Sequence, residues 1–230
     1  AVGFIGAGRA VVSLANMRDA DLWMLAVPDR EISNVAIAVS QLHPSRAPGI
    51  AFHCSGALSS SELLPLSQQG WTVASAHCLL SFATPSEAVQ QFARTPCALE
   101  GDALAIDVLS TAFQEIGGNC FTLLEKNKLL YHAAAVFATN FLPVLQATAD
   151  RLWHDSGMPH DLAKQVRGKL LHNAVANILL LGPEGALTGP AARGDTALVQ
   201  RQAEAVKAWD PPTGDAYKAL SLLASTLAIH

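Results

Sequence analysis

The chain is poor in charge: 15% of its 230 residues are Asp, Glu, Lys or Arg, against about 25% in an average globular protein. Half of the residues are apolar. This combination predicts that much of the surface is covered, most simply by a second subunit. The net charge of −4 and the lack of a basic stripe with interleaved aromatic residues argue against nucleic acid as the main partner.

Sequence signals for export and for membrane insertion are also lacking. The N-terminus has no basic n-region, so we expect no secretory signal. No apolar run reaches the roughly 18 residues of a membrane span. The longest candidate, Leu129 to Leu145, contains His132, Asn140 and Pro143. The four cysteines form no Cys-x-x-Cys pair, which predicts reduced thiols in a cytoplasmic protein.

The start of the chain carries its most informative motif. An apolar run, Val2 to Ile5, predicts a buried strand that leads into Gly6-x-Gly8. A strand, a tight glycine turn and a helix start form the arrangement that binds the pyrophosphate of a dinucleotide. Val11 stands where the full fingerprint has its third small residue. We predict a cofactor site here, the alternative being a tight turn without a ligand; its residues are Gly6, Ala7, Gly8, Arg9 and Ala10.

The second strand of such a domain is missing. Residues 13–21 lead at once into another strand-like run, Leu22 to Val27, which is closed by Pro28-Asp29. A charged residue about 20 positions after the glycine turn normally reads the ribose 2′ position. We favour an omission of residues between Ala10 and Asp21 over a deletion, so the sequence does not separate NADP from NAD.

Strand-like and helix-like segments alternate up to Leu124, as a parallel sheet requires. Further strands are expected at 49–54, 71–76, 96–99 and 119–124, and helices at 31–42, 59–69 and 103–116. Helical periodicity dominates thereafter, with helices expected at 125–150, 162–181, 196–209 and 214–229. The sequence therefore predicts an α/β domain at 1–124, with a doubly wound, mostly parallel sheet, and an all-helical domain at 125–230.

Ligands of doubly wound folds bind at the carboxyl ends of the strands. This edge should collect Gly6-Ala7-Gly8, Val27-Pro28-Asp29, His53-Cys54-Ser55-Gly56 and His77-Cys78. We expect Val27, Pro28, Ser55 and Gly56 to line the cofactor. His53 or His77 would contact a substrate, unless they are ordinary strand-end residues. Adjacent strand residues point to opposite faces, so neither His-Cys pair is expected to hold a metal.

The first helix of the second half carries a polar stripe on an apolar surface. At about 100° per residue, Lys128, His132 and Thr139 lie close to one line, with Asn140 beside them. Burial of such groups without partners is costly, so the stripe should face a ligand or a polar network. If it faces a ligand, His132 is a proton donor, and Lys128 and Asn140 orient the substrate.

Five motifs, in this order, resemble those of a known group of proteins: Gly6-Ala7-Gly8-Arg9, Ala26-Val27-Pro28-Asp29, Phe52-His53-Cys54-Ser55-Gly56-Ala57-Leu58, Tyr131-His132-Ala133-Ala134-Ala135 and residues 187–195. The group consists of Rossmann-like proteins with a helical C-terminal domain of unknown function. It is related to ketopantoate reductase, pyrroline-5-carboxylate reductase and the NADP-dependent oxidoreductases that use a deazaflavin.

The resemblance implies an NAD(P)-binding domain, a helical domain of the 6-phosphogluconate-dehydrogenase type, and a homodimer formed through those helices. It implies no particular substrate. We expect an NAD(P)-dependent oxidoreductase, with NADP preferred over NAD, that transfers hydride to or from a small carbonyl, imine or hydroxy acid. The alternative is a nucleotide-sensing or partner-binding protein that keeps the fold without turnover.

Overall fold

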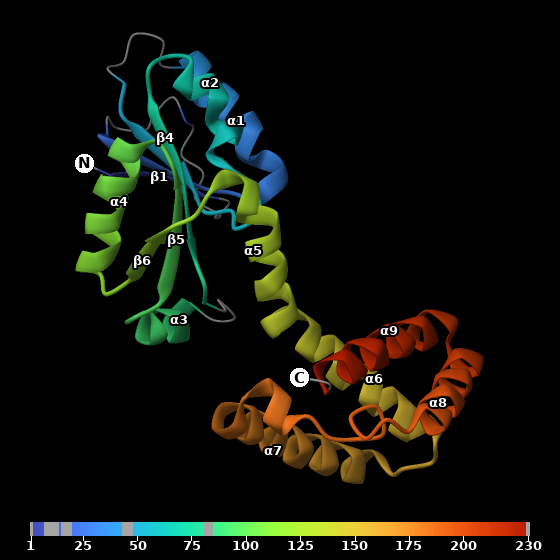
Figure 1. The fold of residues 1–230 in the computed structure, drawn as a ribbon. Helices are drawn as coiled ribbons and strands as arrows, with labels where there is room; N and C mark the ends of the chain where they lie inside the picture. Colours follow the sequence, from blue (N-terminus) through green and yellow to red (C-terminus); the bar gives the residue numbers. More distant parts are fainter. Residues whose placement is uncertain (1, 7–13, 15–19, 43–47, 81–84, 229–230) are drawn as a thin grey trace. The chain divides into compact units, whose positions relative to one another are not determined.

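The computed structural model describes residues 2–6, 14, 20–42, 48–80 and 85–228 (Figure 1). It divides into two compact units, Ala1–Asn140 and Phe141–His230. The described part of the first unit holds a six-stranded sheet with helices, and that of the second is helical. The division lies after Asn140, and not after Leu124 as expected, because Lys128 and Tyr131 contact the sheet.

The strands lie where the sequence predicts them. In spatial order they are β1 (Val2–Gly6), β2 (Leu22–Ala26), β3 (Ile50–His53), β4 (Thr72–Cys78), β5 (Pro96–Gly101) and β6 (Asn119–Thr122). β1 to β4 run parallel, β5 is antiparallel to β4, and β6 is parallel to β5. The carboxyl ends of β1 to β4 therefore meet at one edge of the sheet.

The glycine turn after β1 is seen only at its first residue. Gly6 pairs with Ala26 of β2. The rest of the predicted phosphate site, Ala7 to Ala10, lies outside the described residues. The expected omission between Ala10 and Asp21 also falls largely outside them.

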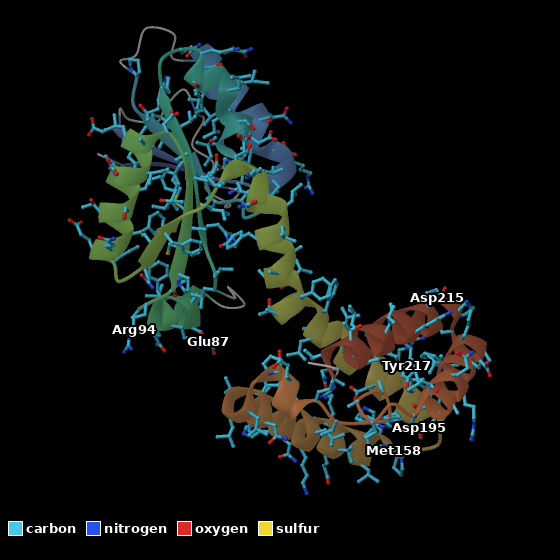
Figure 2. All side chains as sticks on the ribbon, viewed as in Figure 1. Glu87, Arg94, Met158, Asp195, Asp215 and Tyr217 are labelled. Atoms are coloured by element: carbon cyan, nitrogen blue, oxygen red, sulfur yellow. The ribbon has the colours of Figure 1, made fainter. Side chains whose placement is uncertain are left out.

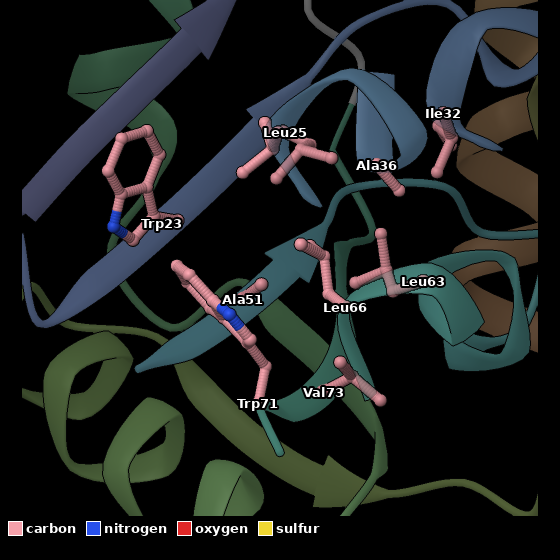
Figure 3. Packing of buried hydrophobic residues seen from close by; sticks show 10 residues of the cluster. Trp23, Leu25, Ile32, Ala36, Ala51, Leu63, Leu66, Trp71 and Val73 are labelled. Carbon is pink, nitrogen blue, oxygen red and sulfur yellow. The ribbon is translucent and has the colours of Figure 1, made fainter. Parts of the chain in front are cut away.

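One face of the sheet packs against α1 (Ile32–Leu42), the 3₁₀ turn η3 (Ser60–Leu63) and α2 (Leu64–Ser67). Trp23 and Trp71 meet edge to face in this core, with ring centroids 6.2 Å apart. Figure 3 shows most of the cluster, which also contains Leu25, Ile32, Ala36, Val39, Ala51, Leu63, Leu66 and Val73. The sequence predicts one continuous helix at 59–69; the structure has η3 and α2 instead.

The opposite face packs against α4 (Ala103–Glu115). Its core is made of Phe52, Ala74, Ala76, Leu99, Ala105 and Leu109. With helices on both faces, the doubly wound, mostly parallel sheet is confirmed. Alternation along β4 places Ser75 and His77 on the α1–α2 face, with Val73. Helix α3 (Pro85–Gln91) was not expected, because a short segment gives little helical periodicity.

The helix expected at 125–150 is divided into four segments. They are the 3₁₀ turn η4 (Glu125–Asn127), α5 (Lys128–Ala135), the π-helix η5 (Val136–Asn140) and α6 (Phe141–Asp155). Pro143 has no N–H for the carbonyl of Thr139, and its ring clashes with that carbonyl in a regular helix. The wider π turn lies just before it. The helix therefore loses the regular spacing of about 3.6 residues per turn after α5. As a result, Thr139 does not lie on the same side of the helix as Lys128 in the way that the sequence predicts.

The second unit contains α6, α7 (His160–Ala186), α8 (Thr196–Trp209) and α9 (Pro211–Leu227). The backbone of α7 is non-helical at Gly182, where φ is 74°, so its regular part ends at Leu181 as predicted. Carboxylates cap the next two helices: Asp195 accepts from the Leu198 N–H, and Asp210 accepts from the Thr213 N–H. The predicted helical region after the sheet is confirmed.

One helical stretch, Glu125–Asp155, is long and apolar enough to cross a membrane, judged by length and composition alone. An uninterrupted apolar run is a stricter criterion, and on that criterion the sequence predicts no membrane span. Several of its apolar side chains are exposed in the single chain, among them Leu129 and Leu130. Exposed apolar surface of this kind is typical of a protein interface as well as of a membrane contact.

Candidate functional site

The turn after β3 is tied to the end of β2. The Ser55 hydroxyl donates to Asp29 Oδ2 at 2.8 Å and accepts the backbone N–H groups of Ala57 and Leu58 at 3.2 and 3.0 Å. This hydroxyl is therefore occupied by the protein itself and shapes the turn. Of the other residues predicted to line a cofactor, Pro28 is exposed and Val27 is half-buried.

His53 supports the same turn from inside. Its side chain is fully buried. Nδ1 accepts the Ser55 N–H at 3.2 Å, and Nε2 lies 2.9 Å from the Ser59 carbonyl oxygen, to which it donates. Burial lowers the pKa of His53, in agreement with this neutral tautomer. Of the two roles open to His53, the structure favours that of a strand-end residue with its polar atoms satisfied.

Lys128 lies beneath the turn and is only 2% exposed. Its Nζ donates to Ser75 Oγ at 2.7 Å and to the Ser55 carbonyl oxygen at 3.2 Å, and it lies 4.0 Å from Glu100 Oε2. Burial lowers the pKa of Lys128, and the charge of Glu100 opposes this. The ammonium thereby ties α5 to the turn after β3, to the middle of β4 and to β5.

Glu100, the partner of Lys128, has its carboxylate fully hydrogen-bonded. Its Oε2 accepts from the Ser60 N–H at 2.8 Å and from Ser75 Oγ at 2.9 Å, and its Oε1 accepts from Ser60 Oγ at 2.7 Å. Sequence reasoning missed Glu100, Ser75 and Ser60. A carboxylate inside an otherwise apolar strand, Pro96–Gly101, was the available signal.

His132 reaches the edge where β3 and β4 end. A Cβ added to Gly56 would lie 2.6 Å from His132 Cδ2 and 2.8 Å from His77 Cε1 and Nε2. The ring centroids of the two histidines are 5.7 Å apart. The structure thus brings His132, His77 and Gly56 together, all within the first unit. Burial, followed by the charges of His132 and Lys128, lowers the pKa of His77 to about 4.

Asn140 is not part of this cluster among the residues described. It is exposed in η5, where its Oδ1 accepts from Thr139 Oγ1 at 2.9 Å. The predicted polar stripe is therefore divided. Lys128 is buried against the sheet, whereas Thr139 and Asn140 are exposed in the π-helix η5.

No group of three or more His, Cys, Asp or Glu in the described ranges is placed to hold a metal ion. Cys54 packs against the core on the α4 face, away from His53. Cys78 contacts Cys97 across the antiparallel pair, with their Sγ atoms 3.2 Å apart.

The architecture of this edge fits a dinucleotide. Gly6, the segment Ala26 to Pro28, and Ser55-Gly56 follow one another along the ends of three adjacent parallel strands, which is where a dinucleotide crosses a doubly wound sheet. His132 adds a group that can donate a proton close to that path. The arrangement can therefore support hydride transfer coupled to proton transfer.

Comparison with known proteins extends this picture. A family model described as a Rossmann-like domain matches residues 8–78, and one described as a domain of unknown function (DUF2520) matches residues 95–224. Among functionally curated proteins, none matches the chain.

Solved structures share the fold. Protein TM1727 from Thermotoga maritima is 26% identical, with a TM-score of 0.74 over 93% of this chain and 81% of that chain. BF3122 from Bacteroides fragilis, assigned as an NADP oxidoreductase, is 20% identical, with a TM-score of 0.71 over 94% and 80%. An imine reductase from Myxococcus stipitatus in complex with NADP+ is 17% identical, with a TM-score of 0.58 over 90% and 75%.

The last two likenesses show the fold alone. The match to the domain of unknown function covers more than half of the chain and directly follows a Rossmann-like region. The chain therefore belongs to the DUF2520 family, whose domain here follows a Rossmann-like domain.

Proposed function

We propose that this protein is an NAD(P)-dependent oxidoreductase that acts on a small carbonyl, imine or hydroxy-acid compound. The observation that carries the proposal is the contact of His132 with Gly56, at the carboxyl edge of a sheet whose neighbouring strands end at Gly6 and Ala26. Solved proteins with this fold include an imine reductase with NADP+ bound and a pyrroline carboxylate reductase with NADP bound.

In this proposal the cofactor lies over residues 6–10, Val27-Pro28 and Ser55-Gly56, with NADP preferred over NAD. Bound nicotinamide supplies or accepts the hydride. His132 holds the proton that the reduced substrate atom takes up. Lys128 is a positioning residue rather than a substrate contact, because its ammonium is buried and holds the Ser55 carbonyl. The substrate role of Asn140 stays a prediction.

We also propose that the protein is a homodimer formed through the helices of the second unit. Leu179 and Leu180 of α7 are 82% and 80% exposed in the single chain. Other large apolar side chains of this helix are exposed as well: Leu162, Leu170, Val175, Ile178 and Leu181. Apolar surface of this extent in a chain with so little charge is typical of a subunit interface.

Cofactor binding is tested with Gly8→Asp. The added carboxylate places bulk and negative charge where the pyrophosphate must approach the backbone, so NADPH affinity should be lost. Calorimetric titration of wild type and variant with NADPH and NADH measures this, with circular dichroism as the control for folding. A folded variant with unchanged affinity, or a wild type that binds neither nucleotide, would contradict the proposal.

Turnover is tested with His132→Ala on a panel of ketoacids, ketones and imines. The variant should lose about 10²–10⁴-fold in turnover, the usual contribution of a general acid, with little change in NADPH affinity. Val11, in place of a small residue of the fingerprint, favours the second candidate function, a nucleotide sensor. Tight NADPH binding without turnover of any compound in the panel would favour that candidate.

A further inference from the structure

His77 is held by α5 through a contact that the proposed mechanism does not use. Lys128 meets Ser75 of β4, and one helical turn later Tyr131 meets His77 on the same face of that strand. The Tyr131 hydroxyl lies 2.9 Å from His77 Nδ1, with the two rings at 89° to each other. Phe121 also packs edge to face against Tyr131. The phenol ring therefore contacts two other rings.

The protonation states of the two groups favour one direction for this hydrogen bond. Burial lowers the pKa of His77 to about 4, so its imidazole is neutral near pH 7. Burial raises the pKa of Tyr131 to about 12, so its phenol keeps its proton. A phenol O–H is a good donor and an unprotonated imidazole nitrogen a good acceptor. Tyr131 is therefore the favoured donor of this pair, and its donation to Nδ1 would place the imidazole hydrogen on Nε2.

The Nε2 side of the ring faces the predicted cofactor edge. A Cβ on Gly56 would lie 2.8 Å from both Cε1 and Nε2 of His77, so this side of the ring borders the turn after β3. The hydrogen bonds among described residues engage His77 at Nδ1 and leave Nε2 without a protein partner. Nε2 is not one of the buried polar atoms that lack a partner, so it is open to solvent and to a ligand atom that accepts a hydrogen bond.

We propose that Tyr131 fixes His77 as the neutral Nε2–H tautomer, and that this N–H donates to the oxygen of a carbonyl substrate beside His132. The inference rests on the proposed function and narrows its substrate class. Bound reduced nicotinamide would supply a hydride to the carbonyl carbon and would itself be oxidised; the π pair would move to the oxygen, which would take a proton from His132. His77 keeps its proton. A protonated imine has no lone pair to accept from His77, so carbonyl compounds are preferred.

The tautomer is tested by NMR on the full-length, ¹⁵N-labelled protein without cofactor. Long-range ¹H–¹⁵N spectra distinguish the two neutral tautomers, and His77→Gln assigns the signals. We expect Nε2–H in the wild type and a rise of the Nδ1–H form in Tyr131→Phe. Tyr217→Phe is the matched control, because Tyr217 is the other tyrosine of the chain and its exposed hydroxyl donates to Gln202 in the second unit (Figure 2).

The catalytic role of His77 is tested by comparing His77→Gln with His77→Asn. The Gln amide nitrogen can replace Nε2, whereas the shorter Asn amide replaces Nδ1. We expect His77→Asn to lower kcat/KM for a carbonyl substrate by about 10²-fold, as loss of a donor to a developing oxyanion does, and His77→Gln to lose much less. NADPH affinity should stay unchanged in both variants.

The inference is overturned if the wild type shows Nδ1–H, if Tyr131→Phe leaves the tautomer unchanged, or if the two His77 variants lose equal activity. A preference for imines over the matching ketones also overturns it. Failure of the wild type to bind NADPH would overturn the proposed function and with it the substrate role, whereas the NMR comparison would still decide the role of Tyr131.

Discussion

Replacement of Gly56 by alanine tests the contact that defines the candidate site. The φ angle of Gly56 is outside the left-handed region, so an alanine fits the backbone. Its Cβ would lie 2.6 Å from His132 Cδ2 and 2.8 Å from two ring atoms of His77. Since carbon atoms pack at about 3.5–4.0 Å, the His132 ring must retreat by about 1 Å.

Contacts with the rest of the fold limit how far the two residues can retreat. His77 is held by Tyr131, and His132 is on the helix that Lys128 anchors to the sheet. Insertion of a methyl group into such a contact costs about 1–3 kcal/mol, and we expect the free energy of unfolding to fall by about 2 kcal/mol. A misplacement of about 1 Å can also cost about 10²-fold in rate, so turnover should fall by that order.

Gly168→Ala is the matched control for this experiment. Gly168 lies inside α7, and a Cβ added there meets no atom within 4 Å. Alanine is favoured over glycine inside a helix by about 1 kcal/mol, so this variant should be more stable than the wild type. Urea denaturation and steady-state kinetics measure both effects. A Gly56→Ala variant with wild-type stability and turnover would refute the close packing of His132 and His77 on this turn.

Three further predictions concern other contacts. Lys128→Met should lower the free energy of unfolding by about 3 kcal/mol, because Glu100 stays buried without its counter-charge. The double variant Lys128→Met/Glu100→Gln should lose less stability than the sum of the losses of the two single variants, and additive losses in urea denaturation would contradict this. The pKa of His77 is lowered from 6.5 to about 4 in the fold, so the stability present above pH 6.5 is lost as the pH falls towards 4, where only the unfolded chain takes up this proton. His77→Gln should weaken this acid loss in pH-dependent urea denaturation, and parallel curves would disprove it. Leu179→Lys with Leu180→Lys should turn a dimer into a monomer in light scattering, and a monomeric wild type at micromolar concentration would refute the interface.

Local patterns in the sequence were sufficient to predict most elements of the fold. The apolar runs that became β1, β2 and β3 are short and are followed by Gly6, Pro28 and Ser55, which is typical of buried parallel strands. Alternation along a strand is a local property, so the separation of His53 from Cys54 follows from the sequence. The break of α7 at Gly182 could also be predicted, because glycine adopts positive φ without strain.

Only the tertiary structure decided what the polar residues contact. Helical periodicity placed Lys128 and His132 on one stripe, but it does not say whether a polar group meets a ligand or the protein. Ser75 and Glu100 engage Lys128 from strands far away in the chain, and β5 runs antiparallel to β4. Because the π-helix before Pro143 changes the helical spacing, Thr139 and Asn140 do not lie on the same stripe as Lys128. Such contacts depend on which segments pack together, and a polar group takes the partner that burial brings within hydrogen-bonding distance.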